Sequence, residues 1–146
     1  TEKTKATGID ALVDATIAHI QTAKSKSLIF TNLVNFDQDY GHRRDIEGYA
    51  KALEYFDFRL TEVLNSLKAD DVLYITADHG CDPSWQGTDH TREFVPLIVY
   101  GSGVEAINLG ERNTFADLGQ TLCQQFNLEP MDYGISVWST ISKECN

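Results

Sequence analysis

Aspartate and histidine side chains occur together in the chain at positions that suit metal binding. Asp78 and His79 follow directly on an apolar, β-branched stretch that ends at Ala77, and His90 lies eleven residues beyond His79 in a loop rich in Gly, Asp and Thr. Both side-chain types need partners where they leave water, because an unpaired buried polar group costs several kcal/mol. A divalent cation satisfies carboxylate and imidazole at once. This segment is therefore predicted to supply metal ligands.

A second pair of candidate ligands, Asp37 and His42, follows the apolar stretch 28–34, which is predicted to be a buried strand. Residues 45–67 carry apolar side chains at helical spacing, and a second strand is predicted at residues 72–77. Strand, long helix and strand make a βαβ unit with two parallel strands. Ligands bind beyond the carboxyl ends of such strands, so both loops should reach one crevice.

The combined ligand set contains imidazole and carboxylate groups and needs no thiolate. Such a mixture suits Mn²⁺, Zn²⁺ or Fe²⁺. One catalytic ion needs fewer than five protein ligands, whereas two ions about 3.5–4 Å apart could share them and clamp a phosphoryl oxygen. Taken singly, each residue is explained more simply as a turn cap, a loop hydrogen bond or a surface group. Their convergence favours a metal site formed by Asp37, His42, Asp78, His79 and His90.

The remaining patterns predict further elements of an α/β domain. A helix should begin near Ile9, with Thr7 as its cap, and another should follow Thr114. Residues 95–100 read as a third strand that runs antiparallel or lies apart from the first two. The tail should pack back on the body through Tyr133, Val137, Trp138 and Ile141.

Composition limits the possible functions. The chain has 146 residues, 42% hydrophobic, and a formal charge of −10, which excludes a disordered chain and argues against nucleic-acid binding through a basic face. Three widely spaced cysteines fit a reducing, cytoplasmic compartment. No apolar run reaches the ~20 residues of a membrane span, so no membrane partner is expected. The chain begins at Thr1 rather than Met, which indicates a piece of something longer.

Three separated blocks resemble phosphopentomutase, a family of the alkaline phosphatase superfamily of two-metal phosphoryl-transfer enzymes. The blocks are Phe36-Asp37 with Tyr40-Gly41-His42-Arg43-Arg44-Asp45, then Thr76-Ala77-Asp78-His79-Gly80, then Gly87-Thr88-Asp89-His90-Thr91-Arg92-Glu93. The resemblance covers nearly all of the chain. One departure is Cys81, where relatives commonly have Asn. The resemblance implies an alkaline-phosphatase-like layered core, with a mostly parallel sheet flanked by helices, of which residues 1–146 would be the C-terminal half.

The resemblance also implies the ligand assignment and the chemistry. Asp37, His42 and His90 would hold one ion, and Asp78 and His79 the other, both Mn²⁺. The family interconverts ribose 1-phosphate, or deoxyribose 1-phosphate, and the 5-phosphate through a phosphothreonine enzyme and a sugar bisphosphate activator. The nucleophilic threonine and the sugar-binding cap would lie outside this chain, which alone would be inactive.

Two alternatives stay open at this point. A cofactor-independent phosphoglycerate mutase or a phosphatase of the same superfamily would share the Asp-His-Gly block. The chain could instead be a non-catalytic metal-binding domain.

Overall fold

The computed structural model describes residues 1–143 and divides the chain into two compact units. The first unit contains Thr1–Lys68 and His79–Pro96, and the second contains Ala69–Asp78 and Leu97–Asn146. The predictions for Cys145 and for the last three residues of the tail lie outside the described residues. Among the described residues, no helix combines the length and apolar character needed to cross a membrane.

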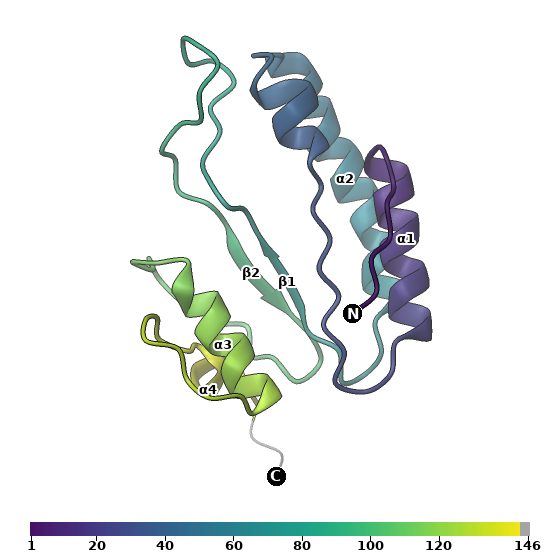
Figure 1. Cartoon of the computed structure of the whole chain (residues 1–146), viewed down its shortest axis with the longest axis vertical. Helices are drawn as coiled ribbons and strands as arrows, with labels where there is room; N and C mark the ends of the chain where they lie inside the picture. The colour runs from purple at the N-terminus through teal and green to yellow at the C-terminus, as the bar shows by residue number, and fades with distance from the viewer. Residues whose placement is uncertain (144–146) are drawn as a thin grey trace. The chain divides into compact units, whose positions relative to one another are not determined.

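The first unit is built on two long helices that lie side by side (Figure 1), α1 (Ile9–Thr22) and α2 (Ile46–Ser66). Gly8 occupies the N-cap position of α1, so the prediction that Thr7 caps this helix is wrong. Ile9, Val13 and Ile20 are buried on α1, as its spacing predicts.

The buried face of α2 includes a charged residue. Ala52, Arg59 and Val63 are its buried side chains, and this spacing of seven and four residues places them on one stripe. The Arg59 guanidinium donates hydrogen bonds to carboxylates of both helices, and these acceptors are Asp10, Asp14 and Glu62. A charge at this position is tolerated because several carboxylates surround it.

Residues 28–34 are extended but, within residues 1–143, belong to no β-ladder, so the predicted strand and its parallel βαβ unit are not formed there. The segment still alternates between half-buried and exposed side chains. Thr31 Oγ1 lies 2.7 Å from Thr16 Oγ1 on α1, whereas the neighbouring Phe30 is 86% exposed. A strand needs a hydrogen-bonded neighbour, and the described chain supplies none here.

The second unit contains the only β-sheet of the described residues, a two-stranded antiparallel ribbon. Strand β1 (Leu73–Thr76) pairs with β2 (Leu97–Tyr100), with Leu73 opposite Tyr100 and Thr76 opposite Leu97. The predicted strands at 72–77 and 95–100 are thus confirmed, and the antiparallel alternative for the latter is the observed one. Pro96 stands just outside β2, where its missing N–H removes no ladder bond.

Helices α3 (Ala116–Phe126) and α4 (Trp138–Ile141) complete the second unit. Val137 and Ile141 are 3% and 1% exposed, so the tail packs as predicted at these positions, but Tyr133 is 78% exposed and does not. The Tyr74 hydroxyl of β1 donates to Gln125 Oε1 on α3 at 2.9 Å.

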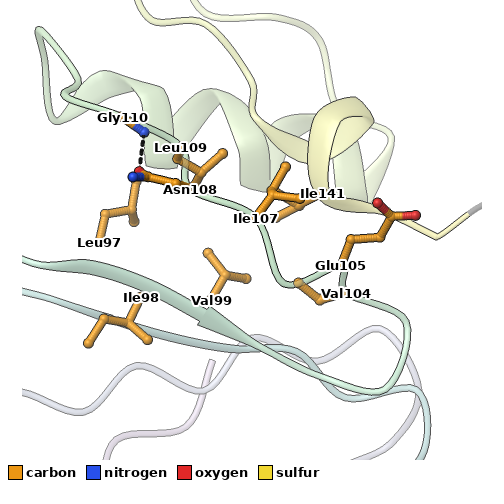
Figure 2. Close-up of a pocket in the computed structure, with 10 residues that line it drawn as sticks. All are labelled: Leu97, Ile98, Val99, Val104, Glu105, Ile107, Asn108, Leu109, Gly110 and Ile141. Carbon is orange, nitrogen blue, oxygen red and sulfur yellow. Dashed lines mark hydrogen bonds between the residues drawn. The ribbon is translucent and has the colours of Figure 1, made fainter.

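A cavity of about 270 Å³, lined by apolar side chains together with Glu105 and Asn108, lies within the second unit, between β2, residues 104–110 and α4. Figure 2 shows Ile107 and Ile141 lying opposite Val99 across this cavity. None of the described residues that line it is a histidine or an aspartate. The cavity therefore contains none of the five predicted metal ligands.

Candidate metal centre

A wide helical turn places Asp37 beside His42. Residues Phe36–Gly41 form a π-helical turn, η1, in which the His42 N–H donates to the Asp37 carbonyl at 2.9 Å. In an α-helix, residues five apart lie about 140° from each other around the axis. The wider π turn closes over five residues instead, and His42 Nε2 lies 3.3 Å from Asp37 Oδ2. The segment predicted to be a loop is thus a turn that positions two candidate ligands.

The turn is fixed against α2 by packing and by a cap. The Phe36 ring makes edge-to-face contacts with Tyr49 and Phe56, at centroid distances of 5.9 and 6.1 Å. The Asp45 side chain caps α2 by accepting from Gly48 N at 2.9 Å. A Cβ on Gly48 would meet the Asp45 carboxylate at 2.3 Å, which explains a glycine inside an otherwise regular helix.

A close backbone approach brings His79 and His90 together. Gly80 and Thr91 form an isolated antiparallel bridge, and these two residues directly follow the two histidines. A Cβ on Gly80 would lie 2.4 Å from Glu93 N, so only glycine permits this approach. The imidazole rings then stack, with centroids 3.7 Å apart and planes 18° apart.

Three imidazoles converge on the carboxylate of Asp37. Its oxygens lie 3.3 Å from His42 Nε2, 3.9 Å from His79 Nε2 and 3.6 Å from His90 Nε2. Asp37, His79 and His90 each offer a ligand atom within 4.8 Å of the others. Two donor atoms bound to one ion at about 2.1 Å are separated by about 3.0–3.4 Å. The His42–Asp37 distance falls in this range, whereas the distances from His79 and His90 to Asp37 are wider and would have to shorten around an ion.

The hydrogen bonds of two of these rings fix which nitrogen can bind a cation. His42 Nδ1 lies 2.5 Å from the Thr88 carbonyl, and His79 Nδ1 lies 2.9 Å from the Gly80 carbonyl. A carbonyl only accepts, so each Nδ1 carries a proton, and Nε2 is the ring nitrogen that remains to bind a cation. Metal-binding histidines usually have this arrangement.

Asp78 is the fifth predicted ligand and belongs to the second unit. It is exposed and follows β1 by two residues. Asp37, His42, His79 and His90 all belong to the first unit. The participation of Asp78, and the division of the five residues between two ions, stay predictions.

The structure adds neighbours that the sequence did not single out as partners of the site. A Cβ on Gly41 would lie 3.0 Å from Cys81 Sγ, which places this thiol against η1. Burial raises the pKa of the Cys81 thiol and also that of the Tyr49 hydroxyl beside it. Burial thus favours the protonated form of this thiol. No sequence pattern marks these contacts, because they join residues far apart in the chain.

The comparisons with known proteins place the chain in a family of metalloenzymes. Residues 2–130 match the family described as the metalloenzyme superfamily. The chain belongs to the metalloenzyme superfamily. This membership confirms the α/β, alkaline-phosphatase-like fold class, although the sheet of the described residues is antiparallel. It also supports divalent metal binding, for which Asp37, His79 and His90 form a possible site.

The relatives that this chain matches include curated phosphopentomutases. It is 62% identical to phosphopentomutase of Colwellia psychrerythraea over 140 residues, which cover 96% of this chain and 35% of the relative. Over 136 residues it is 62% identical to the enzyme of Shewanella woodyi and 60% to that of Shewanella sp. MR-7. The resemblance to phosphopentomutase is thus confirmed. The chain spans about a third of the length of these relatives.

Proposed function

We propose that this chain is the metal-binding, C-terminal part of the catalytic core of a phosphopentomutase. The reaction would interconvert ribose 1-phosphate, or deoxyribose 1-phosphate, and the 5-phosphate. The observation that carries the proposal is the convergence of three Nε2 atoms on the Asp37 carboxylate. Identity of about 60% to curated phosphopentomutases supports the choice of this reaction over that of phosphoglycerate mutases or phosphatases.

In this proposal the side chains bind two divalent ions, both Mn²⁺. Asp37, His42 and His90 would hold one ion, and Asp78 and His79 the other. Bound divalent ions would neutralise charge on the transferring phosphoryl group. The residues of this chain orient the ligands: the Thr88 and Gly80 carbonyls hold the His42 and His79 rings by their Nδ1 atoms. Such fixed rings need little rearrangement when the site fills.

The remaining chemistry is assigned to other parts of the full-length protein. A threonine outside this chain would carry the phosphoryl group, a sugar bisphosphate would act as activator, and a cap domain would select the pentose. The chain spans about a third of its relatives, which supports this division. We expect the 146-residue chain alone to bind metal but not to turn over substrate, and the full-length enzyme to act in the cytoplasm.

The metal assignment is tested by removing one imidazole. Titration calorimetry with Mn²⁺ should show that His90→Ala weakens binding by more than about 100-fold, since loss of a mere partner of a ligand costs 10–100-fold. His19→Ala is the matched control, because His19 lies on α1 and contacts Thr4 Oγ1 at 2.8 Å. Equal Mn²⁺ affinity in the wild type and His90→Ala would refute the assignment.

The reaction is tested in the full-length protein that contains this sequence. Ribose 1-phosphate should be converted to the 5-phosphate in the presence of Mn²⁺, whereas phosphoglycerate should be left unchanged. His90→Ala should abolish the pentose reaction. Turnover of phosphoglycerate, without turnover of the pentose, would favour the other mutase of the superfamily.

A further inference from the structure

Arg44 adopts an unusual backbone conformation next to the candidate metal site. It stands two residues after His42, and its φ of 55° lies in the left-handed region. Side chains other than glycine rarely adopt this region, because Cβ crowds the following carbonyl oxygen. Residues in such conformations are concentrated at functional sites, where surrounding contacts hold them. The conformation therefore calls for an account of what the Arg44 side chain does.

The Arg44 guanidinium donates to three carbonyls of the loop that precedes His90. Nε donates to the Gly87 carbonyl at 2.5 Å, Nη1 donates to the Asp82 carbonyl at 3.0 Å, and Nη2 donates to the Asp89 carbonyl. All three nitrogen atoms of the guanidinium are engaged in these bonds. A planar fork presents its donors from three separate nitrogens and so suits carbonyls spread along a loop, whereas a lysine ammonium presents its three donors from one atom.

The loop that Arg44 holds, residues 82–89, has no helix or strand of its own. Its backbone carbonyls therefore lack the regular partners that secondary structure provides. Asp89 directly precedes His90 in the chain, so holding the Asp89 carbonyl limits the movement of the His90 ring. The Thr88 carbonyl, which lies in the chain between the Arg44 acceptors Gly87 and Asp89, also accepts a hydrogen bond from His42 Nδ1. One side chain thus restrains the loop that positions two imidazoles.

We infer that Arg44 is a positioning residue of the metal centre, whose guanidinium holds loop 82–89 so that His42 and His90 keep their Nε2 atoms at Asp37. This inference rests on the proposed metal binding. The guanidinium acts through the loop carbonyls to which it donates.

Arg43 provides a matched control. It carries the same charge one residue earlier, and its Nε donates at 3.3 Å to the Gln38 carbonyl of its own segment rather than to loop 82–89. Removing a positive charge beside a cation site should by itself strengthen cation binding, because like charges repel. The inference predicts that loss of Arg44 weakens cation binding instead. The direction of the change in affinity therefore separates an effect of charge from an effect of positioning.

The test is titration of the 146-residue chain with Mn²⁺ by calorimetry. Arg44→Ala should bind Mn²⁺ about 10–100-fold more weakly, as is typical for loss of a partner that orients ligands. Arg43→Ala should bind as tightly as the wild type or more tightly. Arg44→Lys keeps the charge but not the fork, and its affinity should fall between those of Arg44→Ala and the wild type. Mn²⁺ affinity in Arg44→Ala equal to that of the wild type would overturn the inference.

Thermal unfolding of the same variants, followed by circular dichroism with and without Mn²⁺, distinguishes positioning from folding. A merely structural Arg44 would lower the metal-free melting temperature and leave the Mn²⁺ affinity of the folded protein unchanged. If Arg44→Ala does not fold, Arg44→Lys decides, and full wild-type affinity in that variant would overturn the inference. A wild-type chain that binds no Mn²⁺ would instead overturn the metal assignment, and this inference with it.

Discussion

The imidazole rings of His79 and His90 stack at a centroid distance of 3.7 Å, with both Nε2 atoms within 3.9 Å of Asp37. The contact depends on the Gly80–Thr91 bridge, which holds the two backbone segments together immediately after each histidine. The two rings therefore share one carboxylate as a result of backbone pairing rather than of side-chain reach.

Gly80→Ala tests this dependence on backbone approach. The added methyl would lie 2.4 Å from Glu93 N and 2.7 Å from Glu93 O, so the two segments must separate. We expect a loss of about 1–3 kcal/mol in the free energy of unfolding, measured with urea, together with weaker Mn²⁺ binding. Gly103→Ala is the control, since its methyl would meet no atom within 4 Å. Equal stability of the two variants would contradict the prediction.

Replacement of Asp45 tests the cap that connects η1 to α2. Asp45→Ala removes the acceptor of the Gly48 N–H and should cost about 1 kcal/mol in the free energy of unfolding. Asp45→Asn keeps an acceptor oxygen at the cap and should stay within a few tenths of a kcal/mol of the wild type. Urea unfolding of the three proteins checks this order, and an alanine variant as stable as the asparagine variant would disprove it.

Asp10 should contribute to acid unfolding. The Tyr55 hydroxyl, which donates to Asp10, and the Arg59 guanidinium hold the pKa of Asp10 below its ordinary 3.8. A lowered folded-state pKa gives stability that is present above pH 3.8 and is lost as the pH falls through the folded value. Unfolding free energy measured from pH 6 to pH 2 should therefore fall less steeply in Asp10→Asn. Asp57→Asn, an equal change of charge at an exposed position of α2, should keep the wild-type slope.

Tyr74 should contribute to the loss of folding stability at alkaline pH. Burial raises the pKa of the Tyr74 hydroxyl from 10.0 to about 12. Between these values the unfolded chain has released this proton and the folded chain has not, so stability falls as the pH rises. Tyr74→Phe should lose about 1 kcal/mol at neutral pH with the Gln125 hydrogen bond, and should show a flatter decline from pH 10 to 12. An unchanged slope in urea unfolding at these pH values would count against this role.

The sequence predicts the local elements well because their signals lie within a few residues. Apolar spacing predicts α1 and α2, and the β-branched runs predict β1 and β2. The strand predicted at 28–34 fails for a physical reason. An apolar run reports a preference for burial, whereas a strand also requires a paired neighbour, which the run itself does not specify.

The candidate ligands can be chosen by residue type, but the contacts that hold them in place cannot be predicted in that way. Asp37, His42, His79 and His90 can be picked out as metal-binding types at the ends of apolar runs. Their geometry depends on a π turn and on Arg44, which reaches carbonyls 38 to 45 residues away. The residues around Arg44 predict the start of a helix, and they do not indicate that Arg44 donates to carbonyls of loop 82–89.

The π turn makes the Asp37–His42 pair sensitive to the length of the intervening segment more than to its composition. Gln38 and Asp39 are exposed, so other side chains fit there. Deleting either residue would leave four steps instead of five, and the turn could close only as an ordinary α-helical one. Natural or engineered variants should therefore tolerate substitutions between Asp37 and His42 far more readily than insertions or deletions there.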